Sequence, residues 1–236
     1  MLSKESIIEY ANRINTVEFN KSKTAQTNKE RFDNITALLA GSVWFEHDVT
    51  QTAQYITRLI IEYLNNNQAI SSLENIESIS SNDEILSVFH KLQNMVLPER
   101  EWDEEVVEKT IDICEMPILL SPWNGNRIIN NLFQINDANP FDGERYFYNI
   151  HNTLIKPLNV IVCSGANHSQ FAAKIINQGK TIINYEYDIR DMYDRIEFDG
   201  NGYKKIGNVE YLQVDAKDDY LFYSGVLFEL GRINIQ

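Results

Sequence analysis

The sequence has 236 residues, 43% of them hydrophobic, which is enough to bury the core of one large domain or two small ones. Its formal net charge of −13 disfavours nucleic acid as a partner, because such a surface repels phosphate over most of its area. The cysteines, Cys114 and Cys163, form no CxxC pair, so a disulfide framework or a zinc site is not indicated. No apolar run reaches membrane-spanning length, and the first residues do not resemble a signal peptide. We therefore expect a cytoplasmic protein without a membrane partner.

Residues 1–97 are predicted to form a helical N-terminal region. Apolar side chains recur at helical spacing from Ile7 to Ile14. Three further helices have a capping residue followed by an acid or amide three positions later: Thr27 with Glu30, Asp48 with Gln51, and Ser81 with Glu84. A linker is expected over residues 65–82, and Pro98 ends the last helix. These helices are more typical of a surface that docks a protein partner than of a catalytic unit.

Residues 98–236 are predicted to form an α/β region. An acidic stretch at 99–108 leads into a short helix over residues 106–114, where apolar side chains keep helical spacing. Residues 118–120 are all apolar and are expected to form a strand. The loop that follows, 121–127, is rich in turn-forming residues and leads into another helix.

The most informative stretch is 158–174, which is predicted to form a buried strand, a glycine turn and a helix. Residues 158–163 are almost continuously apolar, as is typical of a strand covered on both faces. Asn167 or Ser169 is expected to cap the helix, and Gly179 to close it. The first N–H groups of such a helix and the positive end of its dipole suit an anion such as phosphate.

Four residues of this turn are predicted to line an anion pocket: Gly165, Asn167, His168 and Ser169. The reason is the number of polar side chains that directly follow a buried strand, whereas a plain connection needs only one cap. His168, in the first turn of the helix, is the candidate catalytic residue. The alternative is a plain strand-to-helix turn whose Asn and Ser only cap the helix.

The same turn resembles known families. A strand, a Gly-x-x-His turn and a helix that opens with small residues are similar to the phosphate-binding turn of the ParB/sulfiredoxin-like fold. A narrower resemblance is to DUF6710, a family of uncharacterised bacterial proteins, over about residues 115–232. It is carried by this turn and by Pro122-Trp123-Asn124, Arg127 and Asn139-Pro140-Phe141. The first resemblance implies nucleotide binding. The chain has Ser169 where ParB-type turns have arginine, and no cysteine near Asn167, where sulfiredoxins have theirs, so sulfinic-acid reduction is not implied.

The remaining elements follow from local signals. Residues 181–187 are expected to form a strand of mixed polarity, and the turn residues at 199–202 predict a hairpin. Residues 209–214 alternate as a strand, and an amphipathic helix is predicted over 218–230, where Gly231 stops it. Together these elements predict an α+β fold in which a helical N-terminal part packs on a small mixed sheet.

Loops carry the other candidate residues. Arg127 follows a Pro-Trp-Asn-Gly loop and is predicted to clamp an anion, a surface salt bridge being the alternative. Trp123, which precedes Asn124, is expected either to stack on the base or sugar of a ligand or to fill the core. Asp188 ends a strand and is the candidate ligand for Mg²⁺ bound with a nucleotide, a solvated acidic loop being the alternative.

The predicted site has a geometric basis. The turn at Gly165 follows the C-terminal end of its strand, where open α/β sheets bind their ligands. If the next strand pairs in parallel beside it, Asp188 lies at the same edge, and Arg127 faces the turn. His168→Ala is then expected to abolish ligand binding at little cost in stability. Ser169→Ala is expected to cost about 1 kcal/mol as a lost helix cap.

The leading functional hypothesis is a protein that binds a small anionic ligand, a nucleotide or phosphate, with phosphoryl transfer or nucleotide hydrolysis as its activity. In that enzyme His168 and Asp188 carry the catalysis. The first alternative is a non-catalytic interaction module with a degenerate ParB-like fold, whose N-terminal helices dock a protein partner. The third hypothesis is a nuclease, which the net charge of −13 disfavours.

Overall fold

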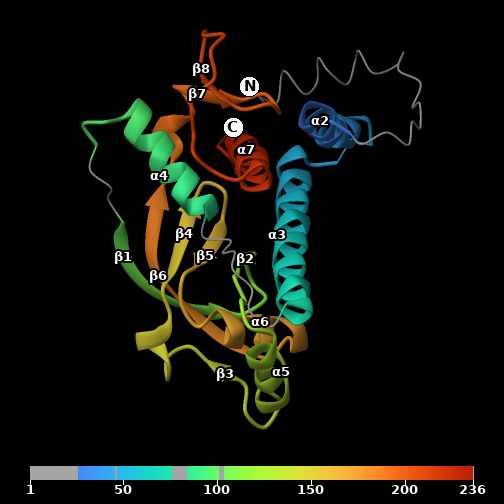
Figure 1. Cartoon of the computed structure of the whole chain (residues 1–236), viewed down its shortest axis with the longest axis vertical. Helices are drawn as coiled ribbons and strands as arrows, with labels where there is room; N and C mark the ends of the chain where they lie inside the picture. Colours follow the sequence, from blue (N-terminus) through green and yellow to red (C-terminus); the bar gives the residue numbers. More distant parts are fainter. Residues whose placement is uncertain (1–25, 46, 76–83, 101–103, 236) are drawn as a thin grey trace.

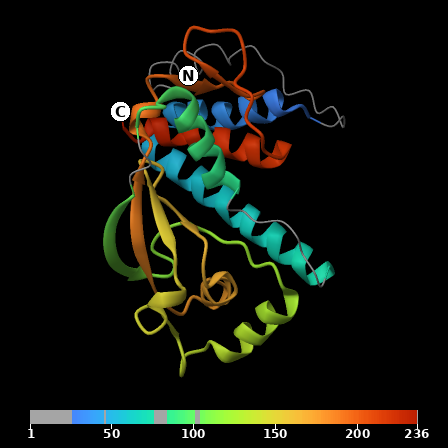
Figure 2. The same cartoon turned by 60° about the vertical axis from the view of Figure 1, so that its left-hand side comes forward.

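The computed structural model describes residues 26–45, 47–75, 84–100 and 104–235. Helices and a short hairpin gather at one end of the molecule, and a sheet with two further helices occupies the other end (Figure 1). The long helix α3 (Val49–Glu74) runs beside both parts (Figure 2). The chain is therefore a mixed α/β protein with a mixed sheet, as predicted. The division at residue 97 stays a prediction.

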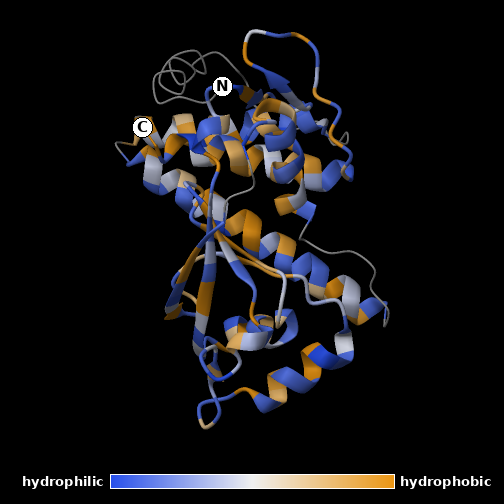
Figure 3. Cartoon of the chain, turned by 90° about the vertical axis from the view of Figure 1, so that its left-hand side faces the viewer, coloured by the Kyte–Doolittle hydropathy of each residue, from blue (hydrophilic) through white to orange (hydrophobic). Residues whose placement is uncertain are grey.

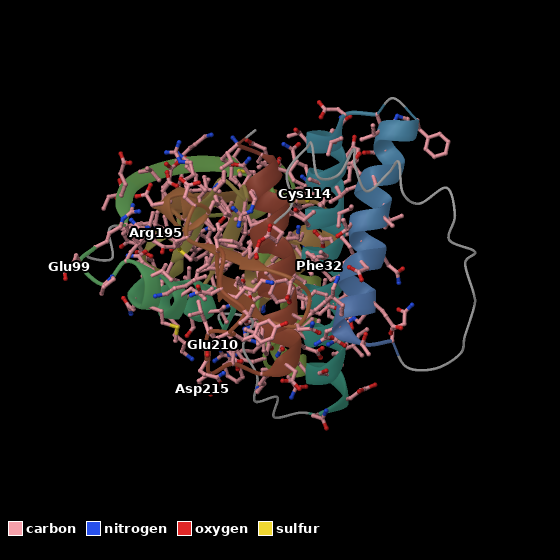
Figure 4. All side chains as sticks on the ribbon, turned by 90° about the horizontal axis from the view of Figure 1, so that it is seen from above. Phe32, Glu99, Cys114, Arg195, Glu210 and Asp215 are labelled. Atoms are coloured by element: carbon pink, nitrogen blue, oxygen red, sulfur yellow. The ribbon has the colours of Figure 1, made fainter. Side chains whose placement is uncertain are left out.

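Among the described residues, the helical end contains three α-helices besides the first half of α3, and a hairpin. They are α2 (Asn28–Trp44), α4 (Glu84–Val96), α7 (Asp218–Ile233), β7 (Ile196–Phe198) and β8 (Tyr203–Lys205). Phe32 of α2, labelled in Figure 4, meets Phe198 of the hairpin edge to face at 5.4 Å between ring centroids. In the described part of the chain, no helix combines the length and the apolar character needed to cross a membrane.

Two of the predicted helix starts are confirmed. Thr27 caps α2 in a capping box, because its hydroxyl accepts from the Glu30 N–H while the Glu30 carboxylate accepts from the Thr27 N–H. Asp48 caps α3 by accepting from the N–H groups of Thr50 and Gln51. The predicted start at Ser81 and the helix expected over residues 7–14 lie outside the described residues.

The predicted linker over residues 65–82 is wrong in its first part, because α3 continues to Glu74. The polar side chains there face the main chain of residues 118–122. Asn65 donates to the Ile118 carbonyl (2.8 Å) and accepts from the Leu120 N–H (2.7 Å). Ser72 donates to the Pro122 carbonyl (2.7 Å). These residues are buried polar groups satisfied by tertiary partners, which a local pattern of Asn and Ser does not show.

The main sheet has the strand order β1-β6-β4-β5-β2, with β3 also paired to β6. Its strands are β1 (Glu105–Asp112), β2 (Ile118–Leu119), β3 (Phe141–Asp142), β4 (Asn152–Lys156), β5 (Val160–Cys163) and β6 (Gly179–Asp188). Strand β4 runs parallel to β6 and antiparallel to β5, whereas β2 runs parallel to β5. Strand β5 therefore runs in the opposite direction to β6. The C-terminal ends of these two strands lie at opposite ends of the sheet, measured along the strand direction.

Both faces of the sheet are covered. Val160 and Val162 of β5 point into a core shared with the helical end, whereas Ile161 and Cys163 point into a second core. The second core contains residues of α5 (Gly125–Gln134) and α6 (Asn167–Ile176). Apolar residues occur along the strands of the sheet, which lies between these two cores (Figure 3). The predicted strand covered on both faces is confirmed over Val160–Cys163, whereas residues 158 and 159 belong to the turn that precedes it.

The helix predicted over residues 106–114 is wrong, because most of this segment forms the edge strand β1. It pairs antiparallel with β6, from Glu105 opposite Glu186 to Asp112 opposite Lys180. Only Ile111 of the strand is buried. Exposed charged side chains are common on edge strands, where they protect the free edge from pairing with another chain. The apolar residues at helical spacing misled the prediction because the pairing partner lies some 70 residues further along the chain.

The C-terminal elements are partly as predicted. The hairpin at 199–202 is confirmed, with β7 and β8 antiparallel on either side of it. The strand predicted over 209–214 is wrong, because this segment makes only an isolated bridge between Tyr211 and Lys204. Gly231 does not stop the last helix, which continues to Ile233. A Cβ at Gly231 would lie 2.4 Å from the Tyr193 hydroxyl, so this glycine permits close packing inside the helix.

Candidate functional site

Helix α6 begins directly after β5, and its first turn has no side-chain cap. Its N-cap residue is Ala166, in the left-handed conformation (φ 53°, ψ 25°). The prediction that Asn167 or Ser169 caps the helix is therefore wrong. The predicted end is wrong too: Asn177 ends α6, and Gly179 begins β6. The first N–H groups of α6 meet no capping side chain, so the positive end of the helix dipole is not neutralised there.

The side chains of Asn167 and Ser169 instead join the turn to its neighbours. Asn167 Oδ1 accepts from the Ser121 N–H (2.7 Å), and Ser169 Oγ donates to Asn131 Oδ1 (2.9 Å). Asn131 lies on α5 and donates in turn to the Arg127 carbonyl (2.7 Å). The bond between Ser169 and Asn131 fixes α5 against α6, and the bond to Ser121 ties the turn to the loop before α5. Ser169→Ala would thus remove a bond between two helices rather than a helix cap.

A fully buried network of polar side chains is hydrogen-bonded to the turn at Gly165. It consists of Asn152, Cys163, Gln170 and Thr181, each 0% exposed. Gln170 Nε2 donates to the Gly165 carbonyl (3.0 Å), while its Oε1 accepts from Thr181 Oγ1 (2.6 Å) and Asn152 Nδ2 (3.1 Å). A satisfied buried network of this kind holds its members in one conformation. The buried Cys163 is therefore a structural residue of the turn.

Gly165 allows another segment of backbone to approach the turn closely. A Cβ at this position would lie 2.3 Å from the Asn149 carbonyl oxygen and 3.1 Å from His151 Cδ2. The neighbouring Ser164 N–H donates to the His151 carbonyl (2.9 Å). The turn is thus packed against the short helix η2 (Phe147–Asn149) and the start of β4. This contact requires glycine at position 165.

His168 is 7% exposed and is held on two sides. Its Nε2 accepts from the Asn124 N–H (3.0 Å), and its ring meets Trp123 edge to face at 5.2 Å between centroids. Burial, together with the nearby charge of Arg127, lowers the pKa of His168 to about 4. The side chain is therefore neutral at pH 7 and uses one ring nitrogen to position the loop before α5. These contacts argue against the expectation that His168→Ala costs little stability.

The low pKa of His168 predicts how stability depends on pH. Between pH 6.5 and 4 the unfolded chain binds a proton at His168 that the folded chain does not, so stability falls as the pH is lowered through this range. Each pKa unit corresponds to about 1.4 kcal/mol. Burial lowers the pKa of His90 to about 4 as well, so both residues contribute to the loss.

We expect His168→Gln to reduce this pH dependence by roughly 2–3 kcal/mol, measured as the change in the free energy of unfolding in urea between pH 6.5 and pH 4. Asn130→Gln, which changes an exposed side chain that does not titrate, is the control and should keep the dependence of the parent chain. Equal slopes in the His168→Gln variant and the parent would show that His168 titrates alike in both states.

Arg127 and Trp123 form a pair at the start of α5. The Arg127 guanidinium carbon lies 5.2 Å from the centroid of the Trp123 ring, which is 44% exposed. Asn124 caps α5, because its Oδ1 accepts from the Arg127 N–H (3.0 Å). Within the described ranges, the Arg127 side chain has no carboxylate partner. Arg127 therefore contacts an aromatic ring instead of forming the surface salt bridge that was the predicted alternative. Trp123 is too exposed for the alternative of a residue that fills the core.

These elements enclose a cleft of about 740 Å³ at the end of the molecule away from α2, α4 and α7, where α5, α6 and β3 lie together (Figure 2). It is bordered by Trp123, by one side of α5, by residues 139–141, by residues between 146 and 151, and by the turn 164–169. Six predicted residues thus line one cleft: Trp123, Arg127, Gly165, Asn167, His168 and Ser169. Asn124 stands beside it as the cap of α5.

The lining of the cleft contains no Asp or Glu among the residues described, and its one Lys or Arg is Arg127. This composition departs sharply from the rest of a chain with 34 acidic and 21 basic residues. A cleft without carboxylates, with an arginine that has no acidic partner and an uncapped helix start, is suited to an anion.

Asp188 does not belong to this cleft. The predicted parallel pairing of β6 beside β5 is wrong, because β4 lies between them and Lys156, at its far end, is the partner of Asp188. Asp188 therefore lies at the opposite edge of the sheet from Gly165. Burial raises its pKa, but hydrogen bonds from Arg190, including one from Nε (2.7 Å), outweigh this and lower the pKa overall. The carboxylate serves to hold Arg190.

The cleft does not fit a magnesium ion held by the protein. Mg²⁺ is usually bound through one or two carboxylates in addition to phosphate oxygens, and the described lining offers none. Elsewhere in the described ranges, no group of three or more His, Cys, Asp or Glu side chains is arranged to hold a metal. We therefore assign no step to a protein-bound metal.

Several residues of the cleft were not predicted as site residues. They are Asn131, Gln134, Asn139, Tyr146, Tyr148, Asn149 and His151. Asn139 lies in the Asn-Pro-Phe motif that carried the family resemblance, and this motif is the signal that pointed to the segment. The residues of η2 are brought to the turn by the close approach at Gly165, for which the sequence contains no local sign.

The fold and the cleft define a mixed α/β protein with a pocket suited to an anion. The sequence profile of the Family of unknown function (DUF6710) matches residues 15–236. The chain belongs to this family, as the motifs around the turn and the loop before α5 predicted. No curated protein and no solved structure matches the chain.

Proposed function

We propose that the chain binds a nucleotide or another phosphate-containing ligand in the cleft between α5, α6 and η2. The observation that carries the proposal is the charge of the cleft. In a chain of net charge −13, the described lining has one arginine and no carboxylate. A ligand with negative charge would meet no repulsion from the cleft wall, and Arg127 offers paired N–H donors for a phosphate group.

The other lining residues support a ligand with a ring system. Trp123 and Tyr148 are 44% and 63% exposed, so their faces are accessible for stacking. Amide side chains at Asn131, Gln134 and Asn139 provide donors and acceptors for the edges of a base or the hydroxyls of a sugar. Aromatic faces and a few polar groups are the usual lining of a small-molecule site.

The resemblance of the turn to the ParB/sulfiredoxin-like fold supports the same ligand class, and we propose that the C-terminal region has this fold. If the protein is an enzyme, phosphoryl transfer or nucleotide hydrolysis is the proposed reaction. His168 and Arg127 are the residues of the cleft that would serve it. Because His168 is neutral at pH 7 and its Nε2 already accepts from the Asn124 N–H, its role is to donate a hydrogen bond from Nδ1 rather than to supply a positive charge.

A thermal-shift panel of nucleotides, with and without Mg²⁺, tests the proposal. We expect at least one nucleotide to raise the melting temperature of the parent chain, because a ligand that binds only the folded state stabilises it. Arg127→Gln should remove this response. Arg195→Gln is the matched control, since Arg195, labelled in Figure 4, is exposed outside the cleft lining, and the variant has the same net charge. A response that persists in Arg127→Gln would contradict the proposed site.

A second candidate function is an interaction module, and one observation favours it. Helix α3 exposes several large apolar side chains at helical spacing: Tyr55 (60%), Leu59 (69%), Tyr63 (54%), Ile70 (55%) and Leu73 (48%). Such a stripe is typical of a helix face that contacts another protein. If no nucleotide shifts the melting temperature and the chain forms a stable complex in a pull-down that is lost in Leu59→Ser, this function replaces the first.

A further inference from the structure

We propose that the cleft selects a nucleoside monophosphate over magnesium-bound triphosphates. This inference rests on the proposed function and names the ligand class of the same site. It follows from three features of the cleft: how much positive charge it holds, how far it extends along α5, and which side chains stand at the end remote from Arg127.

The positive charge of the cleft matches a single phosphate group. A phosphate monoester carries about −1.5 to −2 at pH 7. Arg127 is the one Lys or Arg in the described lining, and it has no carboxylate partner in the described ranges. A triphosphate without a metal carries more charge, and sites that bind its magnesium complex add a lysine and protein carboxylates that hold the metal. Neither is present among the described residues of the lining.

The cleft also extends well beyond the space that a phosphate ion needs. Its wall follows α5 from Arg127 to Gln134, a distance of roughly 10 Å at 1.5 Å per residue. Its volume of about 740 Å³ lies in the range of sites for small organic ligands. The ligand that fills it therefore has a body attached to its phosphate group.

The end of the cleft at Gln134 and Asn139, remote from Arg127, offers polar groups to the part of the ligand that is attached to the phosphate. Asn139 is fixed there, because its Nδ2 donates to the Gln134 carbonyl (2.8 Å). The Gln134 side chain has no hydrogen-bond partner within the described part of the chain, so its amide is available to a ligand. An amide presents donors and an acceptor together, as the edge of a nucleobase does. The exposed ring of Tyr148, which also lines the cleft, adds a stacking surface.

Isothermal titration with the parent chain tests the selection. The probes are a panel of nucleoside monophosphates, the matching triphosphates with Mg²⁺, and inorganic phosphate. We expect at least one monophosphate to bind tenfold or more tightly than its triphosphate and than phosphate. Gln134→Ala should weaken the monophosphate by about tenfold, whereas Asn130→Ala, at an exposed amide of α5 outside the lining, should leave its affinity unchanged.

The other outcomes separate the two proposals. Tighter binding of a triphosphate overturns the selection for one phosphate but leaves the proposed function standing. Equal affinity for phosphate and for every monophosphate, unchanged in Gln134→Ala, overturns recognition of the ligand body. Binding of no nucleotide and no phosphate overturns both the selection and the proposed function.

Discussion

Glu229→Gln is expected to lower the free energy of unfolding by about 3–5 kcal/mol, the range measured when one partner of a buried ion pair is removed. Glu229 is 0% and Arg232 is 3% exposed. Arg232 Nε donates to Glu229 Oε2 (2.9 Å), and Glu229 Oε1 accepts from the Phe198 N–H (2.9 Å). Glutamine has the shape of glutamate and keeps one acceptor, but it leaves the guanidinium in the core without its countercharge. Urea unfolding followed by circular dichroism measures the loss.

Two variants control this experiment. Glu210→Gln makes the same chemical change at an exposed position, labelled in Figure 4, and should alter stability by less than about 0.5 kcal/mol. In the double variant Glu229→Leu with Arg232→Met, both charges of this buried pair are removed. Because replacing a whole buried pair by apolar residues is often neutral, it should be more stable than Glu229→Gln. A Glu229→Gln midpoint equal to that of the parent would mean that the pair does not hold α7 to the hairpin.

The elements predicted correctly are those whose signals are local. The capping box at Thr27 involves residues three positions apart, and the hairpin at 199–202 depends on its own turn residues. The errors arose where a distant partner decides the structure. The segment 106–114 is mostly a strand because β6 pairs with it, and α3 continues past Asn65 because β2 satisfies that side chain.

The candidate site shows the same division. A buried strand, a glycine and a helix are consecutive in the chain, so the turn at Gly165 was predictable from the sequence. Asp188 was misplaced because its position depends on the order of strands, and the insertion of β4 between β5 and β6 reverses the edge at which it lies. The cap was misassigned because Ala166, which no capping preference singles out, takes the left-handed conformation.

Gly165→Ala is expected to weaken ligand binding in the cleft by roughly tenfold or more and to lower the free energy of unfolding by about 1–3 kcal/mol. The added Cβ would stand 2.3 Å from the Asn149 carbonyl oxygen, a backbone atom that cannot rotate away as a side chain would. Either η2 or the turn must shift. Both line the cleft, and the Gly165 carbonyl is bound to Gln170, so the shift spreads to the start of α6.

Two measurements check this expectation, and one needs no ligand. Titration with the tightest-binding nucleoside monophosphate gives the loss of affinity. Hydrogen exchange should become faster at residues 147–151 and 164–170, because the packing between them is lost. Gly41→Ala is the matched control: nothing lies within 4 Å of its added Cβ, and alanine in helix α2 should stabilise the chain by up to about 1 kcal/mol. If Gly165→Ala leaves both affinity and exchange unchanged, the close approach of η2 does not shape the cleft, and the aromatic residues that η2 contributes need not face a ligand.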